Sequence, residues 1–203
     1  MSEHYFSADP EVPFRREPLT AHVWGRDLAL MSGSGVFSRG HVDAGTAVLL
    51  RALDPPTSGD VFLDLGCGYG VVAAALATAR PDATVWAVDV NERALRLTRE
   101  NGESLGLSGI RTATPDDVPR EVVFDAIWSN PPVRIGKDAL HDLMLRWLPR
   151  LAPEGRAMLV VGKNLGADSL QRWLGDQGWP ARRVASAKGF RVLEVRRADE
   201  GPA

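Results

Sequence analysis

The sequence predicts a doubly wound α/β fold, in which helices cover both faces of a mostly parallel β-sheet. From residue 61 onward, short apolar runs of strand length alternate with amphipathic segments of helix length. The chain has 203 residues, 44% of them hydrophobic, which suits one well-buried domain and is too few for two. Only Lys188-Gly189 separates the last two apolar runs, so an antiparallel pair should close the sheet.

An N-terminal extension is expected at residues 1–43, ahead of a main domain at 44–203. Residues 1–18 are polar and interrupted by three prolines, which is typical of an irregular arm. Two short apolar runs, 19–24 and 28–31, then predict a small β-hairpin.

The main domain is expected to begin with a helix at 44–53, for which Asp43 is a suitable N-cap. Strands and helices then alternate, and units of this kind produce a parallel sheet with helices on both faces. The expected strands are 61–65, 84–88, 110–113, 122–128, 156–161, 181–187 and 190–196. The expected helices are 71–80, 92–105, 137–151 and 167–177.

A glycine-rich loop connects the first strand of the alternating region to its helix. Gly66, Gly68 and Gly70 form a G-x-G-x-G motif, where missing Cβ atoms let a ligand approach the backbone and the helix N-terminus supplies N–H donors. The dinucleotide fingerprint G-x-G-x-x-G would need a glycine at the position of Val71. Asp64, just before the loop, would repel pyrophosphate but suits a positively charged ligand such as S-adenosylmethionine.

A second acidic residue supports an adenosine-containing ligand. Asp89 ends the next strand, where a carboxylate can accept hydrogen bonds from both ribose hydroxyls, and Val90 follows it. Asp116 or Asp117, after the third strand, could reach the adenine amino group or could simply form a turn, and Asp116 is preferred. Cys67 lies inside the glycine loop and is interpreted as a small packing residue rather than a nucleophile.

Asn130-Pro131-Pro132 lies just after the strongly apolar strand at 122–128. Each proline fixes its own φ and removes an N–H, and Pro132 biases Pro131 towards an extended conformation. The Asn130 side-chain oxygen and the neighbouring carbonyls are left free to accept hydrogen bonds. This arrangement predicts chemistry on an NH₂ group.

The order of these motifs resembles a known group of enzymes. Segments 63–70, 88–89 and 129–132 resemble class I S-adenosylmethionine-dependent methyltransferases that modify exocyclic or amide nitrogens. Segments 35–39 and 189–192 resemble the small-methyltransferase-domain family, which includes bacterial ribosomal RNA guanine-N2 methyltransferases and compact archaeal relatives.

The resemblance covers residues 4–197 and implies a Rossmann-like sheet with S-adenosyl-L-methionine as the cofactor. It implies direct methyl transfer to RNA, at the exocyclic N2 of a guanine in ribosomal RNA. Asn130 and the Pro131 carbonyl would hold the two amine hydrogens, so these residues are the catalytic candidates. The cofactor-binding candidates are Asp64, Gly66, Cys67, Gly68, Gly70, Asp89, Val90, Asp116 and Asn130.

Two features depart from the family pattern. An aromatic residue that stacks on the target base often follows Asn-Pro-Pro, but this chain has Val133, so stacking would fall to Phe37, Trp128 or Phe190. The larger bacterial relatives carry an additional N-terminal methyltransferase-like domain, for which these 203 residues leave no room. Substrate capture is therefore expected to depend on the N-terminal arm, a basic face or a partner.

Positive charge increases towards the end of the chain. Residues 1–125 carry 11 Lys and Arg against 18 Asp and Glu, whereas residues 126–203 carry 13 against 8. The excess could neutralise RNA phosphates or form an ordinary solvated surface, and the sequence leaves both interpretations open. The substrate-binding candidates are Phe37, Arg39, Pro132, Val133, Arg134, Lys163 and Arg191.

The expected partner is RNA, either ribosomal RNA or a ribosomal subunit, bound by a monomer or weak dimer. The single cysteine and the absence of a signal-like or membrane-spanning stretch favour a cytoplasmic protein without a membrane partner. No metal is expected, because the four histidines show no ligand spacing. The alternatives are adenine-N6 methylation, protein glutamine-N5 methylation, and a catalytically lapsed S-adenosylmethionine-binding interaction protein.

Overall fold

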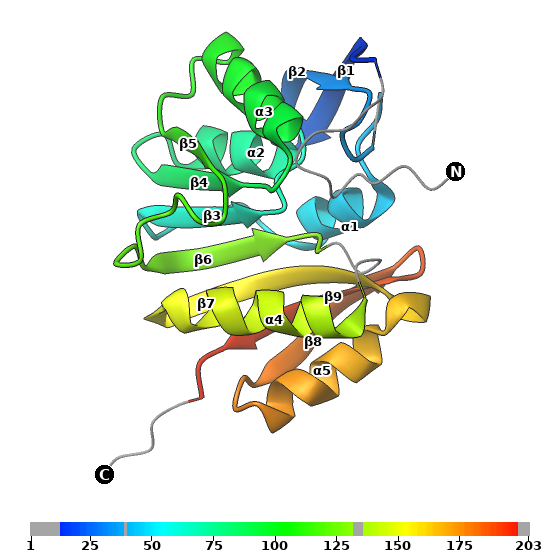
Figure 1. The fold of residues 1–203 in the computed structure, drawn as a ribbon, viewed down its shortest axis with the longest axis vertical. Helices are drawn as coiled ribbons and strands as arrows, with labels where there is room; N and C mark the ends of the chain where they lie inside the picture. Colours follow the sequence, from blue (N-terminus) through cyan, green and yellow to red (C-terminus); the bar gives the residue numbers. More distant parts are fainter. Residues whose placement is uncertain (1–12, 39, 132–135, 199–203) are drawn as a thin grey trace.

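The computed structural model describes residues 13–38, 40–131 and 136–198 and contains a seven-stranded sheet of order β5-β4-β3-β6-β7-β9-β8 (Figure 1). Five neighbouring strands are parallel, and β9 is antiparallel to both β7 and β8. The strands are β3 (Val61–Leu65), β4 (Thr84–Val88), β5 (Ile110–Ala113), β6 (Phe124–Ser129), β7 (Leu151–Gly162), β8 (Ala181–Ala187) and β9 (Phe190–Arg196). The predicted doubly wound α/β fold with an antiparallel C-terminal pair is confirmed.

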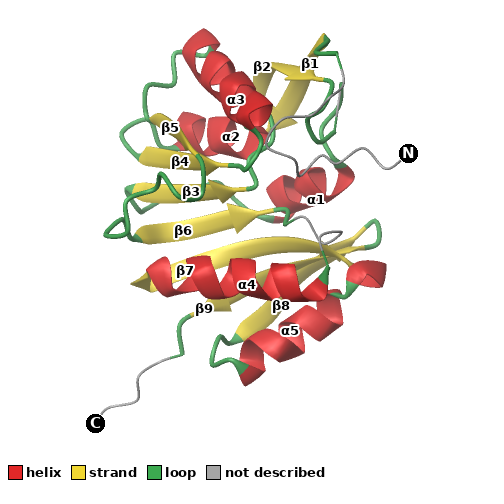
Figure 2. Ribbon diagram, in the orientation of Figure 1, coloured by secondary structure: helices red, strands yellow, loops and turns green. Residues whose placement is uncertain are grey.

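Five helices form two apolar layers, one on each face of the sheet, and Figure 2 shows α4 and α5 in front of it. The helices are α1 (Ala44–Ala52), α2 (Val71–Ala79), α3 (Glu92–Ser104), α4 (Lys137–Trp147) and α5 (Ala167–Asp176). Leu49, Leu76 and Leu97 bring the first three helices into one buried cluster. Met144 and Leu170 bring α4 and α5 into the other.

The N-terminal hairpin forms a separate two-stranded sheet of β1 (Arg16–Val23) and β2 (Arg26–Gly33). Leu28 and Leu30 on β2 are buried in the same cluster as α2 and α3. Asn101 on α3 accepts a hydrogen bond from the Met31 N–H at 2.7 Å and donates to the Met31 carbonyl at 2.9 Å. The same amide donates to the Tyr69 carbonyl at 2.8 Å, so Asn101 joins the hairpin to the glycine loop.

The expected boundary between the fourth main-domain helix and the following strand was wrong. The predicted helix 137–151 ends at Trp147 and continues as a 3₁₀ turn, η2 (Leu148–Arg150), because Pro149 has no N–H to donate to the preceding turn. Strand β7 therefore starts at Leu151, ahead of the predicted start at 156.

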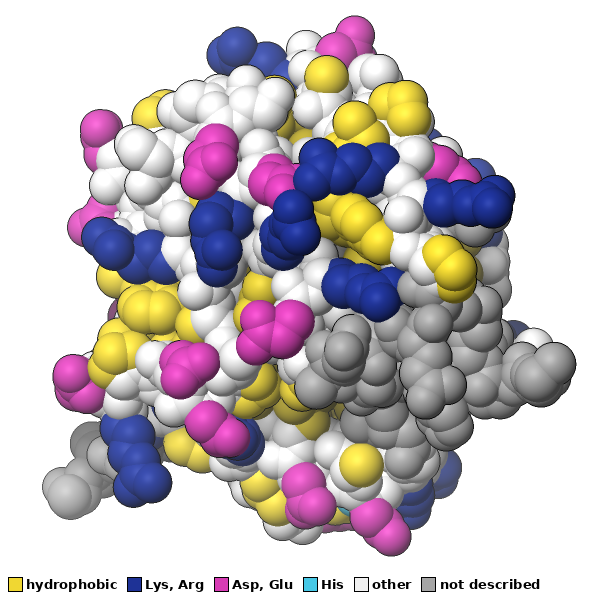
Figure 3. Space-filling model, turned by 45° about the horizontal axis from the view of Figure 1, so that its top comes forward, with side chains coloured by type: hydrophobic (Ala, Val, Ile, Leu, Met, Phe, Trp, Pro, Cys, Tyr) yellow, Lys and Arg dark blue, Asp and Glu magenta, His cyan; other side chains and the backbone are white. Residues whose placement is uncertain are grey.

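Acidic and basic side chains are interspersed on the face drawn in Figure 3, with no large patch of a single sign. The helices within the described ranges are all too short or too polar to cross a membrane.

Candidate active site

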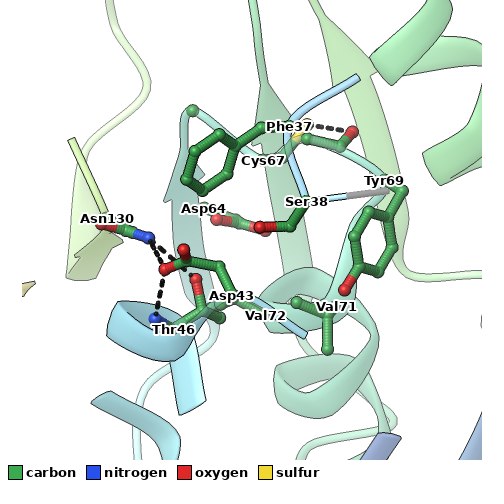
Figure 4. A pocket seen from close by; sticks show the side chains of 12 residues that line it. Phe37, Ser38, Asp43, Thr46, Asp64, Cys67, Tyr69, Val71, Val72 and Asn130 are labelled. Carbon is green, nitrogen blue, oxygen red and sulfur yellow. Dashed lines mark hydrogen bonds between the residues drawn. The ribbon is translucent and has the colours of Figure 1, made fainter. Parts of the chain in front are cut away.

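The glycine loop and Asn130 meet at the carboxyl edge of the sheet, where β3 and β6 end side by side. Leu65 is in register with Ser129 in this parallel pair, and the Ser129 hydroxyl donates to the Leu65 carbonyl at 2.7 Å. The residues that follow the two strands therefore emerge at the same place. The pocket there is lined by Phe37, Ser38, Asp43, Thr46, Asp64, Gly66, Cys67, Gly68, Tyr69, Val71, Val72 and Asn130 (Figure 4).

The three loop glycines have two different roles. Gly66 and Gly68 have φ of 77° and 56°, and a Cβ built on either would meet no atom within 4 Å. Gly70 has φ of 85°, but a Cβ there would lie 2.6 Å from the Thr98 side chain on α3. The first two glycines thus keep the pocket open to a ligand, whereas the third allows α3 to pack closely.

Asp89 lies at the end of β4, as predicted, and holds the glycine loop in place. Its carboxylate accepts hydrogen bonds from the N–H of Gly68 at 3.0 Å and of Asn91 at 2.9 Å. Burial raises the pKa of Asp89, although the backbone donors oppose this shift. Asp89 is not among the residues that line the pocket, so its proposed contact with the ribose hydroxyls stays a prediction.

Asp64 is the most strongly perturbed acid in the pocket. Its side chain is buried and accepts a hydrogen bond from the Ala73 N–H in the first turn of α2, at 2.9 Å. Burial raises the pKa of Asp64 to about 7, against the opposing effect of this hydrogen bond, and the nearby charge of Asp89 raises it further. A bound cation would favour the ionised carboxylate, so the pocket suits a ligand with an ammonium and a sulfonium group.

Cys67 is a buried thiol whose sulfur lies 3.6 Å from the Thr98 hydroxyl. Burial and the charges of Asp89 and Asp64 raise the pKa of this thiol well above its usual value. Cys67 is therefore protonated at neutral pH, which agrees with a packing role and not with nucleophilic catalysis.

Asn130 is held by two residues that the sequence did not mark as part of the site. Its Nδ2 donates to Asp43 Oδ2 at 2.7 Å and to Thr46 Oγ1 at 3.0 Å (Figure 4). Asp43 was predicted only as the N-cap of α1, a role that the structure confirms. No local pattern could have revealed the link, because 87 residues separate Asp43 from Asn130.

Of the aromatic candidates for base stacking, Phe37 lines the pocket and is 45% exposed. The suggestion of Trp128 was wrong, because its side chain is only 2% exposed and packs edge-on against Trp24, with ring centroids 5.8 Å apart. Phe190 is half-buried beside Gly45. A Cβ built on Gly45 would lie 3.0 Å from the Phe190 ring.

The other predicted contact residues lie outside the lining of this pocket. Val90 is exposed next to Asp89, and the exposed Asp116 pairs with Arg146 at 2.8 Å. Lys163 is exposed just after β7, whereas Arg191 is largely buried and pairs with Asp168. Pro131 is buried after Asn130. Arg39, Pro132, Val133 and Arg134 fall outside the described residues.

A larger recess, of about 890 Å³ against about 390 Å³, lies between the hairpin and the C-terminal end of α2. Trp24 and Pro55 contribute to its wall. Because α2 runs antiparallel to the strands, this recess is at the amino edge of the sheet, away from the glycine loop. Size therefore does not identify the active site here; the convergence of polar groups does.

Within the described ranges, no group of three or more His, Cys, Asp or Glu side chains is arranged to bind a metal.

This sheet topology, with an acid near the end of β3, a glycine loop after β3 and Asn-Pro after β6, defines a class I S-adenosylmethionine-dependent methyltransferase. The family model "Methyltransferase small domain" matches residues 27–194, and the chain belongs to that family. Its cofactor is S-adenosyl-L-methionine.

Two curated relatives match this chain at similar identity but over different shares of their own length. The uncharacterized protein YbxB of Bacillus subtilis (strain 168) is 32% identical over 200 residues, which cover 97% of this chain and 100% of YbxB. Ribosomal RNA small subunit methyltransferase C of Pseudomonas aeruginosa (strain LESB58) is 34% identical over 198 residues, which cover 94% of this chain and 58% of the relative. The chain thus spans somewhat more than half the length of that methyltransferase.

Solved methyltransferase structures also resemble this chain. The T. thermophilus 16S rRNA N2 methyltransferase RsmC, in complex with AdoMet and guanosine, matches with a TM-score of 0.76 and 25% identity, over 93% of this chain and 52% of that chain. A ribosomal protein L11 methylase from Lactobacillus delbrueckii matches with a TM-score of 0.61 and 20% identity, over 75% of this chain and 76% of that one, which shows the shared fold.

Proposed function

We propose that this methyltransferase acts on RNA and methylates the exocyclic N2 of a guanine in ribosomal RNA. The observation that carries the proposal is the orientation of Asn130, whose Nδ2 is engaged by Asp43 and Thr46 so that Oδ1 remains as the side-chain acceptor. The guanosine and AdoMet bound by the related RsmC support the choice of guanine. The proposal includes a cytoplasmic location and a monomer or weak dimer.

The residues that line the pocket suit S-adenosylmethionine. Gly66 and Gly68 leave open space beside the backbone, and Asp64 supplies a buried carboxylate for positive charge. When bound, S-adenosylmethionine supplies a methyl group activated by a positively charged sulfur. The residues of the chain bind, orient and desolvate the reacting groups.

In this proposal, Asn130 and Pro131 make the target nitrogen a better nucleophile. The lone pair of an exocyclic amine is delocalised into the base, so the nitrogen is a poor nucleophile while it stays planar. Hydrogen bonds from its two hydrogens to Asn130 Oδ1 and to the Pro131 carbonyl draw the nitrogen towards tetrahedral geometry and direct its lone pair at the methyl group. Orientation and electrostatic stabilisation then supply most of the rate.

Two exposed residues at the same edge fit an RNA substrate. Phe37 presents a half-exposed ring at the pocket, on which an unstacked base can lie. Lys163 follows β7, which runs parallel to β6, so it lies at the same edge of the sheet as Asn130. A base must leave its helix to reach such a pocket, which favours single-stranded or loop RNA.

The deciding experiment uses the full chain with methyl-labelled S-adenosylmethionine and separate fractions of ribosomal RNA, ribosomal subunits, DNA and protein. We expect label in RNA, released as N2-methylguanosine by nucleoside digestion. Label in N6-methyladenosine or in protein glutamine would identify one of the rival activities. Cofactor binding without any labelled product would identify a lapsed enzyme.

The variant Asn130→Ala tests the catalytic role of Asn130 directly. Without its acceptor, turnover should fall by roughly 100-fold or more, the scale of losing one preorganised catalytic hydrogen bond. The dissociation constant of S-adenosylmethionine, measured by calorimetry, should change little, because the glycine loop and Asp64, which are expected to supply most of the cofactor contacts, are intact. Unchanged turnover would refute the role of Asn130.

A further inference from the structure

The side-chain amide of Asn130 lies between two acceptors that belong to the first turn of α1. Asp43 Oδ2 and Thr46 Oγ1 receive its Nδ2 at 2.7 Å and 3.0 Å (Figure 4). A carboxylate accepts hydrogen bonds and donates none, so a flipped amide would place Oδ1 against a second acceptor. The chemistry of Asp43 therefore selects one of the two orientations of Asn130.

We propose that Asp43 and Thr46 are positioning residues for methyl transfer: they lock the Asn130 amide with Oδ1 directed at the substrate amine. The inference rests on the proposed function, in which Oδ1 accepts an amine hydrogen. It adds the start of α1 to the machinery that acts through Asn130. The two residues do not themselves touch the reacting atoms.

The first turn of α1 is well suited to hold these acceptors still. Asp43 Oδ2 also receives the N–H groups of Gly45 at 2.7 Å and Thr46 at 3.1 Å, so the helix cap fixes the carboxylate. Thr46 is only 6% exposed, which restricts its hydroxyl to local partners. A Cβ on Gly45 would lie 2.9 Å from Asp43 Oδ2, so glycine allows this close approach.

The lock has an electrostatic as well as a geometric effect. A hydrogen bond from an amide to a carboxylate is charge-assisted and stronger than one between neutral groups. It polarises the amide and increases the electron density on Oδ1. A more negative Oδ1 stabilises the positive charge that develops on the amine nitrogen during transfer.

Two pairs of variants separate positioning from folding. Thr46→Val removes the hydroxyl with little change in shape, whereas Thr46→Ser keeps it. Asp43→Ser keeps a helix cap but is too short to reach Asn130, whereas Asp43→Asn keeps an oxygen of the original reach. We expect Thr46→Val and Asp43→Ser to lower kcat by about tenfold, the scale of one net hydrogen bond. The melting temperature and the cofactor Kd should stay close to those of the unaltered protein. Thr46→Ser should recover most of kcat, and Asp43→Asn should be intermediate.

A second measurement does not depend on activity. The side-chain amide protons of Asn130 are assigned by NMR as the pair of signals lost in Asn130→Ala. We expect these protons to exchange slowly with solvent in the unaltered protein and in Thr46→Ser, and at least about tenfold faster in Thr46→Val and Asp43→Ser, which each lose a hydrogen bond.

Equal exchange rates in all these variants would overturn the lock, as would faster exchange with kcat unchanged. If the unaltered protein methylates no RNA, the proposed substrate is rejected, while the exchange rates still support or overturn the lock on their own.

Discussion

Asp64 places a carboxylate in a buried position at the pocket, and its titration should link the fold to the binding of the cofactor. Burial raises its pKa to about 7, so the group is partly protonated at neutral pH. S-adenosylmethionine carries positive charge, which an ionised Asp64 carboxylate would attract and a protonated one would not. Cofactor binding should therefore be coupled to the loss of a proton from Asp64.

We predict that the affinity for S-adenosylmethionine falls as the pH is lowered from 8 to 6, approaching about tenfold per pH unit below the pKa of Asp64. Asp64→Asn should bind more weakly at pH 8 and lose most of this pH dependence. Calorimetry across the pH range provides both values. An equally steep profile in Asp64→Asn would assign the titration to another group.

The same pKa shift affects stability in the opposite sense. Because the folded state binds the proton more tightly than the unfolded chain, the contribution of Asp64 to the free energy of unfolding is complete below pH 4. It is lost as the pH rises through about 7. Asp89 acts in the same direction, so only the difference between the unaltered protein and Asp64→Asn isolates Asp64.

The glycine loop combines two kinds of position, one that faces open space in the pocket and one that allows close packing. Gly68 faces open space, whereas Gly70 faces Thr98 on α3. The motif alone does not distinguish these roles, because all three glycines have positive φ and similar spacing.

We predict that Gly68→Ala and Gly70→Ala fail in different ways. Both replacements carry the left-handed backbone cost of about 1–2 kcal/mol, and Gly70→Ala adds a clash with Thr98 of about 1–3 kcal/mol. In urea unfolding, Gly70→Ala should be clearly the less stable. In calorimetry, Gly68→Ala should lose cofactor affinity while it remains folded. Equal stability of the two variants would contradict the assigned packing role of Gly70.

The hairpin of β1 and β2 depends on Asn101 for its attachment to α3. Three hydrogen bonds join the Asn101 amide to backbone groups of Met31 and Tyr69. Removing the amide leaves these largely buried groups without that partner.

Asn101→Ala should reduce the free energy of unfolding by about 2–4 kcal/mol, since leaving a buried polar group unsatisfied costs about 1–3 kcal/mol. Hydrogen exchange should accelerate in β1 and β2 more than in β3. Glu103→Ala, at an exposed position on the same helix, is the control and should change stability by less than about 0.5 kcal/mol. Similar losses in both variants would show that Asn101 has no special role.

At the scale of the whole molecule, parallel strands gather the glycine loop, Asn130 and Lys163 at one edge of the sheet. Helix α1 begins at this edge, where Asp43 caps it, and Arg51 lies in its last turn. Lys163, just after β7, and Arg51, at the far end of α1, are both exposed cations, so they allow a matched test of where RNA binds.

We predict that Lys163→Ala raises KM for RNA several-fold and reduces the slope of log affinity against log salt by about 1, as expected for one lost phosphate contact. Arg51→Ala removes the same charge from an exposed position in the last turn of α1 and should leave both values unchanged. The cofactor Kd should be unaffected in both variants. Identical effects of the two substitutions would point to net charge rather than to a docked substrate.

Local sequence patterns predicted most of the fold and indicated the residues that are expected to bind the cofactor. Apolar periodicity predicted the alternating strands and helices, the loop glycines predicted a ligand site, and a short polar residue predicted the cap at Asp43, because each of these depends on neighbours within a few residues. Pro149 marks where such reasoning failed, since a helical pattern continued across a residue that ends the helix.

Only the tertiary structure decided what Asp43, Thr46 and Trp128 do. Asp43 and Thr46 reach Asn130 across more than 80 residues of chain, and Trp128 faces Trp24 rather than the pocket. The physical reason is that strand pairing and helix packing set these distances, whereas the sequence records only which groups are present. By itself, the sequence determined an acid, a glycine loop and an Asn-Pro motif suited to methyl transfer to nitrogen. The packing of α1 against the end of β6 decided that the Asn130 Nδ2 is engaged and that its Oδ1 is left as the side-chain acceptor.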